Sequence, residues 1–97
     1  MIMVIGITMV KVLPEQEKAA YHALRGIDGI KEVYHLFGEF DFFVIMNADS
    51  KARLNHLLEG IRDRREVTET WTLLISKDES LPEVEIAFSQ VEVPAIS

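Results

Sequence analysis

The chain has 97 residues, of which 48% are hydrophobic and 27% are charged, and it contains no cysteine. This length provides one domain with one small core, and the composition is typical of a compact soluble protein rather than a disordered chain. The lack of cysteine excludes a disulfide framework, a thiolate metal site and a cysteine nucleophile, and we expect a cytoplasmic protein. The apolar run over residues 1–10 has no basic leader and is too short to cross a bilayer, so we expect no membrane association.

The net charge of −6 is distributed unevenly along the chain. Residues 1–77 contain ten basic and eleven acidic side chains, whereas residues 78–97 contain five acidic side chains and no basic one. Neither part has the basic stripe that phosphate binding requires, so the pattern argues against direct contact with DNA or RNA. We therefore expect a domain over residues 1–77 followed by an acidic C-terminal extension over residues 78–97.

Both alternate sets of residues in 2–12 are apolar, which predicts a strand with two covered faces. Pro14 suits the first turn of a helix, and the apolar spacing that follows predicts a helix of about three turns ending near Gly26. Residues 30–37 and 40–48 have the composition of strands, and the tight turn expected at Gly38-Glu39 joins them into a hairpin.

A second helix is predicted after Asp49 or Ser50, because apolar residues recur at i, i+3, i+4 and i+7 up to Ile61. The arginines at positions 62, 64 and 65 suit the negative end of that helix better than an anion site. Residues 67–76 form the last strand of the domain. We expect Val67, Trp71, Leu73 and Ile75 on one side of it, and Thr68, Thr70, Thr72 and Leu74 on the other.

The order βαββαβ predicts an α+β, ferredoxin-like fold, with a four-stranded antiparallel sheet and both helices on one face. The strand at 40–48 is nevertheless apolar on both sides, with Phe40, Phe42, Val44 and Met46 on one and Phe43 and Ile45 on the other. A second copy packed face to face would cover the bare side, and the alternative is that the tail folds over it.

The tail itself alternates between acidic and apolar residues and predicts an added edge strand, on its own subunit or on a neighbour. The alternation slips by one residue at Ser89-Gln90. This slip predicts a bulge or a break inside the added strand.

Three short stretches carry a family resemblance. They are Gly29-Ile-Lys-Glu-Val-Tyr34, the turn Gly38-Glu39-Phe40-Asp41 and the pair Thr70-x-Thr72. Together they resemble the ligand-binding domain of the Lrp/AsnC family of feast/famine regulators, over about Val4 to Lys77. Full-length members begin with a helix-turn-helix, whereas this chain starts at the first strand, so the resemblance implies a stand-alone effector domain.

The resemblance also implies a dimer of the dimeric α+β barrel type and further assembly into an octamer or decamer. Family members bind small effectors, typically amino acids, between dimers near the hairpin turn. Full-length Lrp/AsnC relatives are the expected protein partners.

A ligand site at this turn has a physical rationale as well. A glycine-bearing turn leaves N–H groups free to meet a carboxylate, and Asp41 can pair with an ammonium group. The candidate ligand-binding residues are Gly38, Glu39, Phe40, Asp41, Thr70 and Thr72. Each also has an ordinary explanation, because Gly and Asp are common in turns and Thr is common in strands.

We expect no catalytic residue, metal or cofactor. Histidines 22, 35 and 56 fall in three different elements, without carboxylate partners at metal-ligand spacing. The leading hypothesis is a non-catalytic module that senses an amino acid or related metabolite and modulates transcription through partners.

Two alternatives remain open. The first is an enzyme, because dimeric α+β barrels include cofactor-independent oxygenases and isomerases, and relatives of the family include haem decarboxylases. Its candidate residues are His35, Tyr34 and Asp41, although no pair of titratable groups has the spacing of a nucleophile and a base. The second is a ligand-free partner that assembles with full-length relatives.

Overall fold

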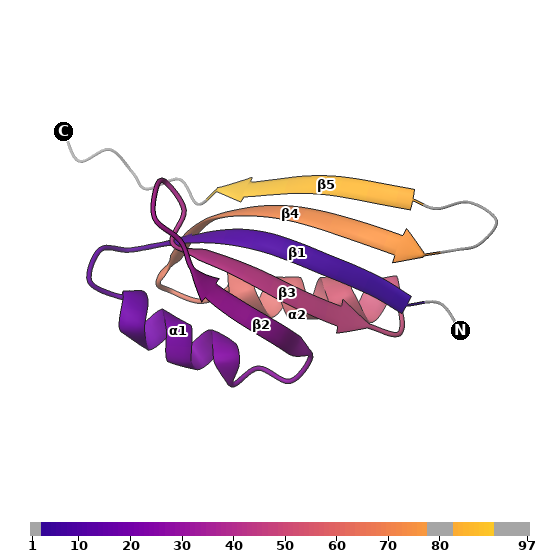
Figure 1. Ribbon diagram of the computed structural model, residues 1–97, viewed down its shortest axis with the longest axis horizontal. Helices are drawn as coiled ribbons and strands as arrows, with labels where there is room; N and C mark the ends of the chain where they lie inside the picture. The colour runs from indigo at the N-terminus through magenta and orange to yellow at the C-terminus, as the bar shows by residue number, and fades with distance from the viewer. Residues whose placement is uncertain (1–2, 78–82, 91–97) are drawn as a thin grey trace.

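The computed structural model describes residues 3–77 and 83–90, and this part of the chain contains the elements in the predicted order (Figure 1). The elements are β1 (Met3–Val12), α1 (Glu17–Arg25), β2 (Ile30–His35), β3 (Phe42–Ala48), α2 (Lys51–Arg62), β4 (Val67–Lys77) and β5 (Glu83–Gln90). The strands form one antiparallel sheet in the order β2-β3-β1-β4-β5. The predicted α+β, ferredoxin-like fold is confirmed, and β5 is the added edge strand, paired with β4 of its own chain.

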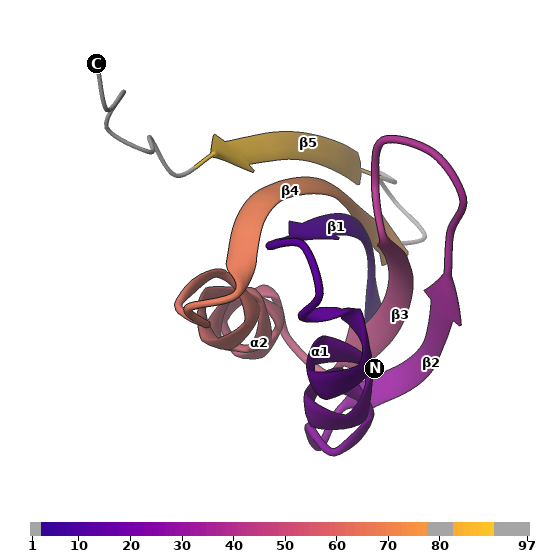
Figure 2. The same ribbon diagram turned by 90° about the vertical axis from the view of Figure 1, so that its left-hand side faces the viewer.

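Both helices pack against the same side of the sheet (Figure 2). We call this side the covered face, and its buried apolar strand residues are Val4, Val10, Val12, Phe42, Val44, Met46, Val67 and Leu74. Leu24 of α1 and Leu54 and Ile61 of α2 are fully buried against it, so the core lies between the sheet and the helices. The other side, the open face, carries Ile5, Ile7, Met9, Phe43, Ile45, Trp71, Leu73 and Ile75.

The two helices begin in different ways. At α2 the Ser50 hydroxyl accepts a hydrogen bond from the Arg53 N–H at 3.2 Å, which is the predicted cap. At α1 the first helical residue is Glu17, later than the position of Pro14 suggested. Glu15 has a left-handed backbone with φ of 70°, and this conformation interrupts the helix before it can start at Pro14.

The prediction of a tight turn at Gly38-Glu39 is wrong. The connection is a six-residue loop, Leu36–Asp41, which we call the hairpin loop. The Leu36 N–H donates to the Asp41 carbonyl at 2.8 Å, and the Asp41 N–H donates to the Val10 carbonyl at 2.9 Å. These bonds close the loop at Leu36 and Asp41, Phe40 makes no such backbone bond within the described chain, and β3 begins at Phe42 rather than at Phe40.

One strand residue lies on the other side from the one expected. Val67 is buried opposite Val12, although the alternation of β4 placed it on the same side as Trp71. The register shifts between Lys11 and Val12, so that Thr68 is an extra residue in β4. The Thr68 hydroxyl donates to the Lys11 carbonyl at 3.2 Å, which holds the bulge in place.

The added strand β5 pairs with β4 in an unbroken register from Glu83 to Gln90. Val84, Ile86 and Phe88 lie on the open face, opposite Ile75, Leu73 and Trp71 of β4. Ser89 and Gln90 still pair with Thr70 and Glu69, so the described part of β5 has no bulge at the predicted position, and residues 91–97 lie outside the described residues.

Candidate functional site

The hairpin loop positions the candidate residues Gly38 to Asp41 at the end of β1. The Asp41 side chain is half-buried, and its Oδ2 accepts a hydrogen bond from the Val12 N–H at 2.8 Å. Gly38 has φ of 131°, a conformation that favours glycine, although a Cβ there would meet no atom within 4 Å. The loop thus has a base that is bonded to β1 and a tip that stands free of its own chain.

The threonines predicted for the site are both buried on the covered face. Thr70 lies opposite Val10, and Thr72 lies opposite Thr8. The Thr72 and Thr8 hydroxyl oxygens are 3.0 Å apart and form a buried hydrogen bond. The Thr70 hydroxyl has no hydrogen-bond partner among the described residues.

Asp41 and Thr70 therefore flank the same end of β1, because Val10 accepts the Asp41 N–H and pairs with Thr70 on its other side. Thr72 lies two residues after Thr70 in β4, and its hydroxyl is already hydrogen-bonded to that of Thr8. Sequence reasoning missed Thr8, and the only signal for it was a polar residue within an aliphatic strand.

A very small cavity lies beside Thr70. Its volume is about 10 Å³, and it is lined by Arg62, Val67, Thr68, Glu69, Thr70 and Ser89. The Arg62 Nε is buried there and, like the Thr70 hydroxyl, has no hydrogen-bond partner within residues 3–77 and 83–90. A buried water requires about this much space and several polar partners, so the cavity suits one water molecule rather than a metabolite.

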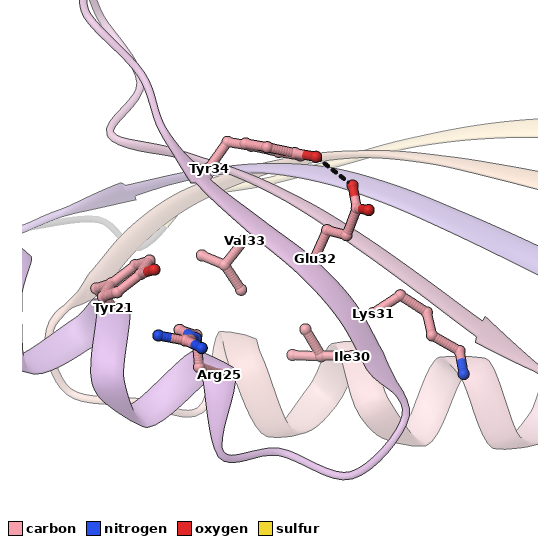
Figure 3. A pocket seen from close by; sticks show the side chains of 7 residues that line it. All are labelled: Tyr21, Arg25, Ile30, Lys31, Glu32, Val33 and Tyr34. Carbon is pink, nitrogen blue, oxygen red and sulfur yellow. Dashed lines mark hydrogen bonds between the residues drawn. The ribbon is translucent and has the colours of Figure 1, made fainter.

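Two larger hollows lie between α1 and β2, and sequence reasoning missed both. The first has a volume of about 360 Å³ and is lined by Tyr21, Arg25, Ile30, Lys31, Glu32, Val33 and Tyr34 (Figure 3). The second has a volume of about 690 Å³ and is lined by Glu17, Lys18, Tyr21, His22, Val33, Tyr34, His35 and Phe42. Both form where a helix packs against an edge strand, an arrangement that periodicity does not reveal.

Two of the residues considered for an enzyme, Tyr34 and His35, line the second hollow, whereas Asp41 belongs to the hairpin loop. The Tyr34 hydroxyl donates to the Glu32 carboxylate (Figure 3). This hydrogen bond and the negative charge of Glu32 raise the pKa of Tyr34. A tyrosine with a raised pKa is a weaker acid, so its environment does not favour proton transfer at neutral pH.

Residues 3–77 and 83–90 contain no group of three or more histidine and acidic side chains that could hold a metal ion. In the same part of the chain, no helix is long and apolar enough to span a membrane.

Solved structures show the same fold. PHS023, a hypothetical protein from Pyrococcus horikoshii, is 25% identical over 73% of this chain and 87% of its own, with a TM-score of 0.69. FFRP-DM1 is 25% identical over 73% of this chain and 96% of its own, with a TM-score of 0.70. AsnC from E. coli resembles the chain in fold, at 22% identity and a TM-score of 0.69, and the match covers 78% of this chain and 52% of AsnC.

A comparison with curated proteins found no match. The family model described as the Lrp/AsnC ligand binding domain matches residues 3–84, which extend from β1 into the start of β5. The fold and this match together show that the chain belongs to the Lrp/AsnC ligand-binding domain family.

Proposed function

We propose that this domain binds an amino acid or a related small metabolite at the hairpin loop and modulates transcription through protein partners rather than by contacting DNA. The observation that carries the proposal is the family match across residues 3–84, which includes the Gly38–Asp41 signature. The near-neutral charge of residues 1–77 supports the proposal that the domain does not contact DNA, because DNA binding needs several cationic contacts to phosphates.

The chemistry of the hairpin loop suits an α-amino acid. A carboxylate has about four lone-pair positions, and the hydrogen bond from Val12 uses one of those on Asp41, which leaves acceptor capacity for an ammonium group. Among the described residues, the N–H groups of Gly38, Glu39 and Phe40 make no hydrogen bond to another backbone group. They are therefore suitable donors for a carboxylate, and Phe40 supplies an apolar neighbour.

The threonines have different proposed roles. The Thr70 hydroxyl, which has no partner within the described chain, lines the small cavity that suits one water molecule, so its proposed contribution to binding is through a bridging water. Thr72 contributes through Thr8, since a ligand that bonded it directly would have to replace a buried hydrogen bond.

The first test is the Asp41→Asn variant. Amino acids are first screened by their effect on the melting temperature, and the affinity of any that bind is then measured by calorimetric titration. Removing the negative charge should weaken binding by about 1.5–3 kcal/mol, the scale of a hydrogen bond to a charged group. The fold should persist, because an asparagine oxygen can still accept the Val12 N–H.

Asp63→Asn is the matched control, because it removes an exposed carboxylate at the end of α2, and its affinity should equal that of the wild type. Unchanged affinity in Asp41→Asn would exclude Asp41 from the site. Thr70→Val should weaken binding by less than Asp41→Asn. If no amino acid changes the melting temperature, the ligand-free assembly partner becomes the better hypothesis.

We further propose that the functional unit is a dimer, which assembles into larger rings. Large apolar side chains remain exposed on the open face, including Trp71 at 41%, Phe88 at 48% and Ile86 at 68%. A contiguous apolar surface of this kind is typical of a protein interface.

A further inference from the structure

One row before the hairpin-loop end of the open face, where Lys11, Glu69 and Gln90 form the last row, lies a set of aromatic and sulfur-containing side chains. Tyr34 lies opposite Phe43, Phe43 opposite Met9, Met9 opposite Trp71, and Trp71 opposite Phe88, so that one residue from each strand contributes. We call this set the aromatic row. The rings of Trp71 and Phe88 have centroids 4.7 Å apart, and both are about half exposed. In the next row, Ile45, Ile7, Leu73 and Ile86 are aliphatic, and the β2 member is Glu32.

The hairpin loop stands at the same end of the sheet. It rises on the side away from the helices, which is the side of the open face (Figures 1 and 2). Its base is held by the three hydrogen bonds that link Leu36 to Asp41 and Asp41 to β1. Near its tip, Phe37 is 96% exposed. An aromatic ring presented to water on an anchored loop is a typical anchor for a partner surface.

We propose that the hairpin loop is a dimerisation arm, in which Phe37 of each copy packs against Trp71 and Phe88 of a second copy. This inference rests on the dimer proposed above and adds the residues that close it.

The charge distribution favours a second copy as the occupant of the open face. Every residue that β1, β3 and β4 place between the aromatic row and Ile5 is uncharged: Met9, Phe43, Trp71, Ile7, Ile45, Leu73, Ile5, Asn47 and Ile75. The charged residues Lys11, Glu69 and Glu32 lie at the margins of this region, so two copies can meet over it without burying a charge.

Symmetry then determines what the arm meets. If the twofold axis runs parallel to the strands, the same ends of the two sheets come together and the strand order is reversed between them. β2 of one copy then lies over β5 of the other, the edge strand that carries Phe88. Because the arm joins β2 to β3, it reaches Phe88 and the neighbouring Trp71. An axis across the strands would instead bring the arm to the opposite end of the partner sheet, where Met3 lies.

The first experiment uses Trp71, the only tryptophan in the chain. The dimer dissociation constant is measured by sedimentation over a dilution series, together with the emission of Trp71. Phe37→Ala should raise the dissociation constant at least tenfold and shift the emission of the remaining dimer to longer wavelength. Leu13→Ala is the matched control, since Leu13 is also an exposed apolar residue beyond the end of β1, and it should change the constant less than twofold.

The outcomes separate the arm from the dimer itself. A Phe37→Ala dimer with wild-type strength and emission would overturn the arm while leaving the dimer intact. A wild-type chain that stays monomeric would overturn the proposed dimer and the arm together, without bearing on ligand binding at Asp41.

A second experiment tests the geometry directly, because the chain has no native cysteine. Isotope-labelled Phe37→Cys chains are mixed with unlabelled Phe88→Cys chains and oxidised, and disulfide-linked pairs are identified by mass. We expect mixed pairs, because the proposed arm places residue 37 of one copy beside residue 88 of the other. A disulfide forms only where the two Cα atoms lie within about 7 Å. Met3→Cys replaces Phe88→Cys in the control, because Met3 is 49% exposed and Phe88 is 48% exposed. Mixed pairs with Met3→Cys alone would show an axis across the strands and overturn the arm.

Discussion

On the covered face of β3, Phe42, Val44 and Met46 are at most 1% exposed, whereas Phe43 and Ile45 on the open face of the same strand are only partly buried. The two faces are similarly apolar, and they differ in what lies opposite them. The covered face is shaped for α2: a Cβ on Gly6 would lie 3.0 Å from the Met46 Cγ and 3.1 Å from a Leu54 methyl. The open face has no such small residue in its central rows, and both helices lie on the other side of the sheet, so its side chains are left for a partner to cover (Figure 2).

The largest expected effect comes from a charge on the covered face. Val44 is fully buried, so Val44→Asp would bury a carboxylate without a partner. An unpaired buried charge is among the most destabilising single changes, and we expect the variant to be unfolded at room temperature. Circular dichroism measures this directly, and a cooperative melting transition near that of the wild type would contradict the assignment of this face to the core.

The adjacent residue provides the matched comparison. Ile45→Asp places the same carboxylate one position along the strand, on the open face, where solvent reaches it in a monomer. We expect a folded chain that no longer dimerises, shown by a monomer in sedimentation and a native circular dichroism spectrum. If Ile45→Asp dimerised as strongly as the wild type, the interface would have to lie elsewhere.

Alanine substitutions of two glycines should change the stability by smaller amounts and in opposite directions. Gly6→Ala would crowd Met46 and Leu54, which are fully buried, and should cost about 1–3 kcal/mol. Gly60 lies within α2, and a Cβ there would meet nothing within 4 Å. Gly60→Ala should therefore stabilise the domain by about 0.5–1 kcal/mol. Urea unfolding measures the free energy of unfolding of both variants. Equal changes of the same sign would show that α2 does not pack closely against Gly6.

The smallest effect concerns the turn between α2 and β4, outside both faces. Burial raises the pKa of Glu66, but the hydrogen bond and charge of Arg64 and a backbone hydrogen bond lower it by more, so the pKa lies below its ordinary value. A lowered pKa in the folded state stabilises the protein above the ordinary pKa of glutamate, and this stabilisation is lost as the pH falls through the lower value. Glu66→Gln should be less stable than the wild type at pH 7, and the difference should shrink as the pH falls below that ordinary value.

The same measurement, urea unfolding, applied at several pH values checks this expectation. A difference between Glu66→Gln and the wild type that did not change with pH would show that the carboxylate charge contributes nothing to stability.

Local periodicity predicted the strands and helices, because each element here repeats its own pattern over six residues or more. It failed where a contact with a distant segment decides the outcome. The hairpin loop is longer than the predicted turn because it closes between Leu36 and Asp41, which is held against β1, and Val67 faces the core because Thr68 adds a residue to β4. Neither contact leaves a signal in the local pattern.

In the candidate site too, local sequence predicted some features, whereas contacts between distant segments determine the others. The Gly38–Asp41 signature identified the loop, but the acceptor role of Asp41 towards Val12 depends on two segments that are distant in sequence. The bond between Thr8 and Thr72 depends on the register of β1 and β4, which no single strand specifies. The hollows beside α1 arise from how a helix seats on an edge strand.

The central position of β1 in the sheet has a consequence for how the chain folds during translation. β1 is synthesised before its partners β3 and β4, which come much later in the chain, and Val4 pairs with both Ala48 and Ser76. At a translation rate of about 5–20 residues per second, its apolar strand therefore waits several seconds before its second neighbour exists. During that interval one edge of β1 has no neighbour, so pairing with β3 is the first contact that can shield this apolar strand from aggregation.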